Sequence, residues 1–136
     1  MVENIHPKQV WQAMLDDPAA RLVDVRTDAE WTYVGLPDLT EAGKQTVLIP
    51  WQIFPAMAVN GDFVGQMAEA GLMPGHKLYF LCRSGVRSLA AAAAAEAAGY
   101  SAVFNMLDGF EGPPDGDGHR GRVAGWKADG LAWRQR

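Results

Sequence analysis

Residues 78–88 read LYFLCRSGVRS: an apolar run, a short polar loop and the start of a helical pattern. The apolar residues at 78–81 are typical of a buried strand. The alanine-rich run from Ser88 to Ala98 predicts a helix, because alanine has the highest helix propensity. A strand joined to a helix by a tight loop indicates an α/β unit of a parallel sheet. The loop opens with Cys82, the single cysteine of the chain.

The same alternation of strand and helix patterns runs along the rest of the chain. Apolar runs without strict alternation, separated by helical patterns, predict an α/β fold: a small, mostly parallel β-sheet flanked by helices on both faces. Ligands of such sheets bind at the carboxyl ends of the strands, where Cys82 lies. We expect strands at 22–25, 47–49, 78–81 and 102–106, helices at 6–15, 63–70 and 88–98, and a helical turn at 28–33.

Length and composition narrow the class of protein. The 136 residues, 49% hydrophobic and 21% charged, predict one globular domain spanning residues 1–136. The net charge of −4 argues against a nucleic-acid partner, since such binders rely on basic surface. One cysteine forms no internal disulfide, which fits a reducing compartment. The first twelve residues have no apolar signal-peptide core, and no apolar run approaches the ~20 residues of a membrane span. We therefore expect a cytoplasmic protein with no membrane partner.

The loop after residue 81 has the features of a site for a reactive thiolate. The following helix directs unpaired N–H groups and the positive end of its dipole at the loop, and two arginines add full charges. All of these stabilise the thiolate, which is the nucleophilic form of cysteine. Cys82 is thus the predicted catalytic nucleophile. Gly85 lets the loop turn its N–H groups towards the sulfur, and Arg83 and Arg87 are predicted to hold an anionic substrate.

Such a thiolate can attack an electrophilic centre carried by an anion: phosphorus, arsenic, or the outer sulfur of a thiosulfate-like donor. Thiol phosphatases place five residues between cysteine and arginine, whereas here Ser88 stands at that spacing and Arg87 comes one position earlier. The loop is therefore one residue short for a phosphatase. The absence of a second, resolving cysteine argues against the hypothesis of an arsenate reductase. A binding module without catalytic activity is the third alternative, although the intact cysteine, glycine and arginine argue against it.

The motifs together resemble the single-domain rhodanese-like family of sulfurtransferases. The loop with Ser88 matches the six-residue active-site loop of that family. Asp24-Val25-Arg26 followed by Glu30-Trp31 resembles its upstream motif, and Gly109-Phe110-Glu111-Gly112 its downstream motif. The resemblance covers nearly the whole chain and extends to Trp126 and Leu131 near its end.

The resemblance implies a sulfurtransferase in which Cys82 takes the sulfane sulfur of thiosulfate or a persulfide donor. Cyanide or a thiol would remove the sulfur. The Cys82 persulfide would be held by the loop residues Arg83, Ser84, Gly85, Val86, Arg87 and Ser88. The implied partners are a small anionic donor, a thiol or cyanide acceptor and a protein donor or acceptor. Arg87 would favour an anionic donor and Arg83 would help attract it. No cofactor is implied, and the three histidines give no metal-ligand spacing.

Asp24, Arg26 and Glu30 are predicted to support the site rather than to catalyse. A carboxylate at a strand end can bind loop amides, and Arg26 can pair with Glu30 over one turn. Thr27 and Glu30 also form a capping-box pattern.

The chain departs from the family after the upstream motif. A longer polar loop at 36–46 replaces the usual histidine-containing segment, which leaves the shape of the pocket rim open. The apolar stretch at 51–57 is expected to cover the site or to form a partner surface.

Overall fold

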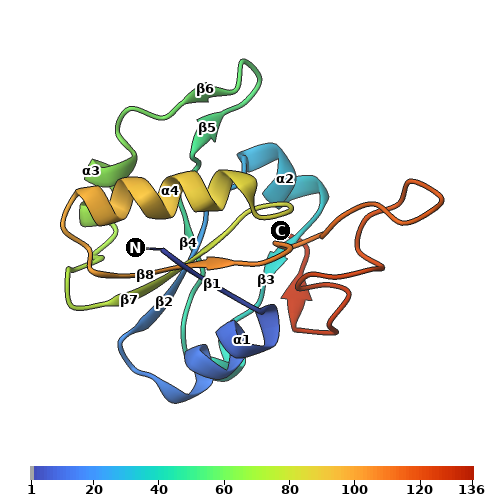
Figure 1. Cartoon of the computed structure of the whole chain (residues 1–136), viewed down its shortest axis with the longest axis horizontal. Coiled ribbons are helices and arrows are strands. Elements are labelled where there is room, and N and C mark those ends of the chain that lie inside the picture. The colour runs from blue at the N-terminus through green and yellow to red at the C-terminus, as the bar shows by residue number, and fades with distance from the viewer. Residues whose placement is uncertain (1) are drawn as a thin grey trace.

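The computed structural model describes residues 2–136 and is built around a five-stranded sheet. Every neighbouring pair of its strands runs parallel, so the predicted α/β fold with a parallel sheet is confirmed. Figure 1 shows the sheet between its helices. In spatial order the strands are β1 (Glu3–Ile5), β8 (Ala102–Met106), β7 (Lys77–Leu81), β2 (Ala20–Asp24) and β4 (Val47–Leu48).

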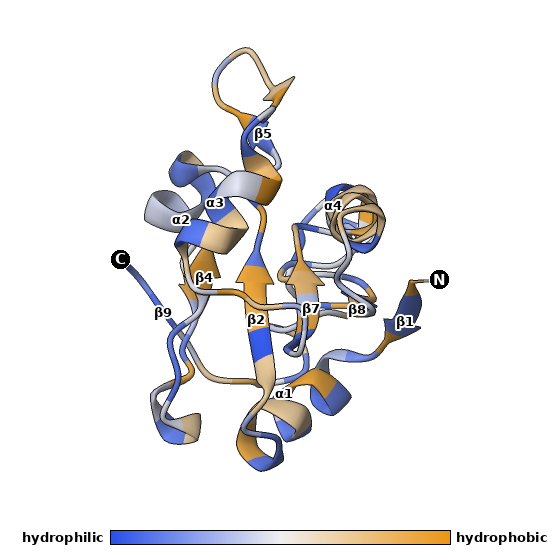
Figure 2. Ribbon diagram, turned by 90° about the vertical axis from the view of Figure 1, so that its left-hand side faces the viewer, coloured by the Kyte–Doolittle hydropathy of each residue, from blue (hydrophilic) through white to orange (hydrophobic). Residues whose placement is uncertain are grey.

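Helices cover both faces of this sheet. On one face α3 (Phe63–Glu69) and α4 (Val86–Ala97) pack over a core that includes Phe80 and Val103. On the other face α1 (Pro7–Asp16) packs with Trp126 from the tail. The hydropathy colouring in Figure 2 marks the central strands β2 and β7 as apolar along most of their length, as strands buried on two faces must be.

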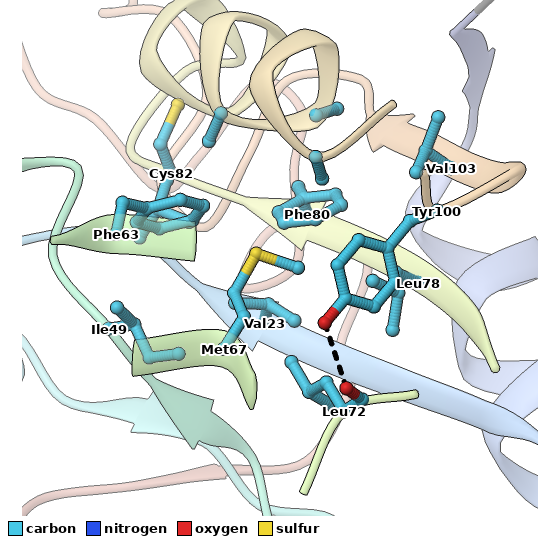
Figure 3. Packing of buried hydrophobic residues seen from close by; sticks show 14 residues of the cluster. Val23, Ile49, Phe63, Met67, Leu72, Leu78, Phe80, Cys82, Tyr100 and Val103 are labelled. Carbon is cyan, nitrogen blue, oxygen red and sulfur yellow. Dashed lines mark hydrogen bonds between the residues drawn. The ribbon is translucent and has the colours of Figure 1, made fainter. Parts of the chain in front are cut away.

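Strand β7 determines the side on which Cys82 lies. Side chains alternate between the two faces of a strand. Leu78 and Phe80 accordingly belong to the core under α4, and Tyr79 and Leu81 belong to the opposite core. Cys82 continues the first series. Figure 3 shows it at one end of that core, with its sulfur directed towards α4.

Several short elements were not predicted. Strand β1 has no apolar run to signal it, because it is an edge strand held by backbone pairing to β8 and mostly exposed. The expected loop at 36–46 contains β3 (Leu36–Pro37), which pairs with β9 (Trp133–Arg134), and a 3₁₀ turn at Thr40–Ala42. The apolar stretch at 51–57, for which no strand was expected, contributes to a hairpin of β5 (Gln52–Ile53) and β6 (Ala58–Val59).

The helix boundaries agree with the predictions to within about two residues. Helix α4 begins at Val86 rather than Ser88, because Gly85 takes a left-handed conformation (φ 107°) and becomes its N-cap. Helix α2 (Asp28–Tyr33) begins after Thr27, whose hydroxyl accepts a hydrogen bond from the Glu30 amide while the Glu30 side chain returns to Thr27. The predicted capping box is therefore present. Among residues 2–136, no helix is long and apolar enough to cross a bilayer.

Candidate active site

The Cys82 loop lies between the carboxyl end of β7 and the first turn of α4 (Figure 1). The Sγ of Cys82 receives a hydrogen bond from the Gly85 amide at 3.1 Å, and the Ser88 hydroxyl lies 3.2 Å from it. Only a residue tolerant of positive φ folds the loop back on the sulfur in this way, and Gly85 supplies that freedom. Two donors and a helix N-terminus converge on the sulfur, an arrangement that stabilises a thiolate.

Asn105, on the neighbouring strand β8, orients the Ser88 hydroxyl. Its Nδ2 lies 3.2 Å from the Gly85 carbonyl and 3.0 Å from Asn4 Oδ1, so this end of the amide is the donor. Its Oδ1 therefore faces Ser88 and accepts from the hydroxyl at 2.5 Å. A hydroxyl has one proton. Ser88 can thus donate to Asn105 while the sulfur is a thiol, and turn its proton to the sulfur once the thiolate forms.

The downstream glycine-aromatic motif fastens the loop from behind. The amides of Phe110 and Gly112 donate to the carbonyls of Cys82 (2.7 Å) and Arg83 (3.1 Å). Gly109 has φ 61°, and a Cβ there would lie 2.3 Å from the Cys82 carbonyl oxygen. This close approach requires glycine, which explains why the motif begins with it.

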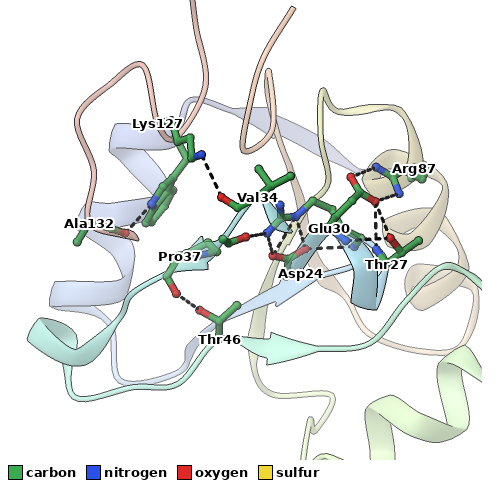
Figure 4. Close-up of polar contacts among 12 residues, drawn as sticks. Asp24, Thr27, Glu30, Val34, Pro37, Thr46, Arg87, Lys127 and Ala132 are labelled. Atoms are coloured by element: carbon green, nitrogen blue, oxygen red, sulfur yellow. Dashed lines mark hydrogen bonds and ion pairs between the residues drawn. The ribbon is translucent and has the colours of Figure 1, made fainter. Parts of the chain in front are cut away.

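Arg87 is held in a two-pronged ion pair. Its Nη1 and Nη2 donate to Oε1 and Oε2 of Glu30 at 2.6 and 2.9 Å (Figure 4). Burial by itself would raise the pKa of Glu30, but hydrogen bonding and the charge of Arg87, with the Thr27 amide, outweigh it and lower that pKa. The same hydrogen bonds raise the pKa of Arg87 above its ordinary value. An anionic donor that used Arg87 would have to compete with Glu30.

Asp24 and Arg26 form a second arginine–carboxylate pair, and both side chains are fully buried. Arg26 Nε and Nη2 donate to Asp24, and Nη2 also donates to the Gly35 carbonyl at 2.8 Å. The guanidinium lies 4.3 Å from the ring centroid of Phe110, in the downstream motif. The prediction that Arg26 pairs with Glu30 was wrong: Arg26 pairs with Asp24, and Glu30 pairs with Arg87. Neither Asp24 nor Arg26 lines the hollow over Cys82.

An open hollow of about 630 Å³ lies over the sulfur. The predicted residues Arg83, Ser84, Val86 and Arg87 line it with Cys82, and Ser88 lies fully buried behind the sulfur. None of the loop residues 36–46 contributes to its lining. Met57 and Gln52 come from the stretch 51–57 that was expected to cover the site.

Sequence reasoning missed two residues around Cys82. Arg120 lines the hollow, although its segment has the composition of a solvated tail; its Nη1 donates to the Gly112 carbonyl at 2.7 Å. Nothing local in the sequence signals this contact. Asn105 did have a signal, since it is an amide inside an otherwise apolar strand and is 3% exposed. Among residues 2–136, no three His, Cys, Asp or Glu side chains gather in a group that could hold a metal ion.

Comparison with known proteins identifies the family. The model of the rhodanese-like domain matches residues 6–112, well over half of the chain, so this protein belongs to the rhodanese-like domain family. An uncharacterized protein of Rickettsia conorii is 34% identical over 98% of each chain.

Solved structures agree with this placement. The crystal structure of Rv0390 from M. tuberculosis is 43% identical in sequence to this chain and superimposes on it with a TM-score of 0.90. The match covers 99% of this chain and 98% of the Rv0390 chain. The homodimeric polysulfide-sulfur transferase of Wolinella succinogenes has a TM-score of 0.65 over 99% of this chain and 80% of its own, at 19% identity. The second likeness is one of fold alone.

Proposed function

We propose that this protein is a cytoplasmic sulfurtransferase that carries sulfur as a persulfide on Cys82. The observation that carries the proposal is the environment of the sulfur: the Gly85 amide and the Ser88 hydroxyl lie within 3.2 Å of Sγ, at the N-terminus of α4 and beneath an open hollow. Membership of the rhodanese-like family supports it. The polysulfide-sulfur transferase with the same fold is consistent with it.

In the first step the Cys82 thiolate attacks the outer sulfur of the donor. With thiosulfate, the new S–S bond forms as the bond between the two sulfurs of the donor breaks, and sulfite leaves with the bonding electron pair. The product is a Cys82 persulfide anion. The Gly85 amide and the Ser88 hydroxyl are the donors nearest to this charge.

In the second step an acceptor removes the sulfur. A thiolate or cyanide attacks the outer sulfur of the persulfide, the S–S bond breaks, and the Cys82 thiolate is regenerated. Backbone hydrogen bonds from Phe110 and Gly112 hold the rear of the loop in place, so we expect the loop to keep its conformation through both steps.

The pairing of Arg87 with Glu30 argues against a phosphatase reaction. In addition to the short spacing of the loop, both terminal nitrogens of Arg87 donate to Glu30, so an oxyanion over Cys82 would have to compete with that carboxylate.

Intact-protein mass spectrometry tests the proposal. After incubation with thiosulfate, the wild-type protein should gain about 32 Da, and cyanide or dithiothreitol should remove the gain. Cys82→Ser should show no gain while it retains the fold by circular dichroism. A wild-type protein that gains no mass with thiosulfate or with inorganic polysulfide would contradict the proposal, as would a gain of the same size in Cys82→Ser.

A further inference from the structure

The hollow over Cys82 continues into a second, apolar groove. This groove has a volume of about 400 Å³ and runs between α2 and the turn of the β5–β6 hairpin. Glu30, Val34 and Met57 line both spaces, so the two spaces form one trough. Figures 1 and 2 show the hairpin standing away from the sheet on the side of α2.

The trough is much larger than an inorganic sulfur anion. The hollow over Cys82 alone measures about 630 Å³. A water molecule takes roughly 30 Å³ of liquid, so an anion with a handful of heavy atoms fills only part of that space. Hollows of several hundred Å³ are the size that binds larger organic molecules. The dimensions therefore fit an occupant that brings a reacting sulfur on a longer chain.

One side of the trough is apolar and exposed. Tyr33 on α2 and Phe54 in the hairpin turn are 82% and 59% exposed, and Val86 at the start of α4 is 77% exposed. Met57, also in the hairpin turn, lines both spaces. Large apolar side chains that gather around one opening, rather than being scattered singly, are typical of an interaction surface.

The other side of the trough is cationic. Arg83 is exposed, and no side-chain partner for its guanidinium occurs within residues 2–136. Arg120 uses one of its five N–H donors on the Gly112 carbonyl, and the others have no partner within residues 2–136 and can bind an anion. Arg87 contributes no net charge, because it is paired with Glu30. Glu111 is the other carboxylate of the lining, so positive charge exceeds negative charge there.

From this juxtaposition we propose that the trough binds a polypeptide segment whose cysteine accepts sulfur from Cys82, with apolar residues on one side of that cysteine and acidic residues on the other. The apolar residues lie against Tyr33 and Phe54, and the acidic residues pair with Arg83 and Arg120. Charge complementarity and the continuity of the groove with the catalytic hollow select this occupant. The inference rests on the proposed function and adds the class of acceptor.

The transfer step is balanced without a further reactant. The thiolate of the segment attacks the outer sulfur of the Cys82 persulfide, a new S–S bond forms on the acceptor, and the original S–S bond breaks. The electron pair of that bond returns to Cys82 as a thiolate, and the negative charge of the outer sulfur leaves with it, so the acceptor becomes a persulfide anion.

Synthetic decapeptides with a single cysteine test the proposal. The first peptide has Leu and Phe on one side of the cysteine and two Glu on the other; the second replaces Glu by Lys, and the third replaces Leu and Phe by Ser. Each is made in both sequence orders. Cys82 is first loaded with inorganic polysulfide, and mass spectrometry then follows the loss of about 32 Da from the protein. We expect the first peptide to react about tenfold faster than the other two.

Variants assign the preference to the two sides of the trough. Arg120→Glu should reverse the preference between the Glu and Lys peptides, and Arg120→Gln should abolish it. Arg122→Glu is the matched control, because Arg122 is exposed and does not line the trough, so it should leave the preference intact. Tyr33→Ser combined with Phe54→Ser should remove the advantage of Leu and Phe, whereas Met73→Ser, at an exposed position elsewhere, should not.

The outcomes separate this inference from the proposed function. Failure of the wild-type protein to load any sulfur contradicts the proposed function, and the inference with it. Loading followed by equal rates for the three peptides contradicts the inference alone. So does a preference that Arg122→Glu alters as much as Arg120→Glu. If sedimentation shows a dimer that the Tyr33 and Phe54 substitutions disrupt, a second copy of the chain occupies the trough, and the proposal is wrong.

Discussion

The two sides of the Cys82 loop differ in how their polar groups are satisfied. Behind the loop, Asp24, Arg26, Ser88 and Asn105 are almost fully buried, and each pairs with a neighbour in the protein. Among residues 2–136, Arg26 Nη1 is the one nitrogen of these four side chains that is buried without a hydrogen-bond partner. In front of it, around the opening of the trough, Arg83 is exposed and without a side-chain partner in the described chain. Unpaired buried groups are strongly destabilising, whereas exposed ones remain hydrated. Changes behind the loop should therefore act on stability and on the thiolate, and changes in front should act on the choice of partner.

The largest expected effect breaks the buried pair behind the loop. Asp24→Ala leaves the Arg26 charge buried without its partner, which should lower the free energy of unfolding by about 3–5 kcal/mol. Asp28→Ala is the matched control: Asp28 pairs with Arg136 at the surface, and its loss should cost about 0–1 kcal/mol. Urea unfolding at pH 7 measures both. Equal losses in the two variants would mean that burial does not distinguish the two pairs.

The next effect concerns the close approach between the downstream motif and the loop. Alanine at Gly109 or at Gly130 must adopt a positive φ, which costs about 1–2 kcal/mol at either position. At Gly109 the new Cβ also meets the Cys82 and Arg83 carbonyls, which should add about 1–3 kcal/mol. A Cβ at Gly130 has no neighbour within 4 Å. Urea unfolding should thus give Gly109→Ala a clearly lower free energy of unfolding than Gly130→Ala. Equal free energies would mean that the close approach of Gly109 to the loop does not require glycine.

Ser88→Ala should slow the chemistry of Cys82. Loss of the hydroxyl 3.2 Å from Sγ removes a hydrogen bond to the thiolate, so alkylation by iodoacetamide at pH 7 should be about tenfold slower. Ser84→Ala changes a serine that lines the hollow and serves as the control for access of the reagent. If both variants react at the wild-type rate, Ser88 does not stabilise the thiolate.

The Glu30–Arg87 pair should make stability depend on pH in the acid range. The pKa of Glu30 is lower in the folded protein than its ordinary value of 4.5. The pair therefore stabilises the protein above that value, and this contribution is lost as the pH falls through the lowered pKa. Glu30→Gln should cost about 1 kcal/mol at pH 7 and almost nothing at pH 2, measured by urea unfolding at the two pH values. A difference that persists at pH 2 would assign the effect to packing.

The smallest effect on stability is expected in front of the loop. Arg83→Ala should change the free energy of unfolding by less than about 0.5 kcal/mol, because the side chain is exposed. The same variant should load sulfur from thiosulfate about two- to fivefold more slowly, since it removes a positive charge that attracts the anion. Stopped-flow or mass-spectrometric loading rates check this. A stability loss as large as that of Asp24→Ala would place Arg83 among the structural residues.

Much of the fold followed from local pattern. The strands β2, β7 and β8 are buried apolar runs, and alanine propensity, Gly85 and the Thr27–Glu30 capping box mark the helix starts. Strand β1 and the hairpin at 52–59 escaped prediction because backbone pairing with a distant or facing strand, rather than their own side chains, forms them.

Sequence by itself determined that a cysteine lies between a buried strand and a helix N-terminus, because strand, loop and helix are contiguous and their patterns are local. Only the tertiary structure decided which side chains form hydrogen bonds with the residues that follow this cysteine in the loop and helix. Glu30 and Arg87 are 57 residues apart, and Asn105 reaches Ser88 from another strand. Arg120 reaches the hollow from a loop whose composition gives no sign of it. Contacts of this kind depend on how the strands are ordered and how the tail returns across them, and no local pattern encodes that order.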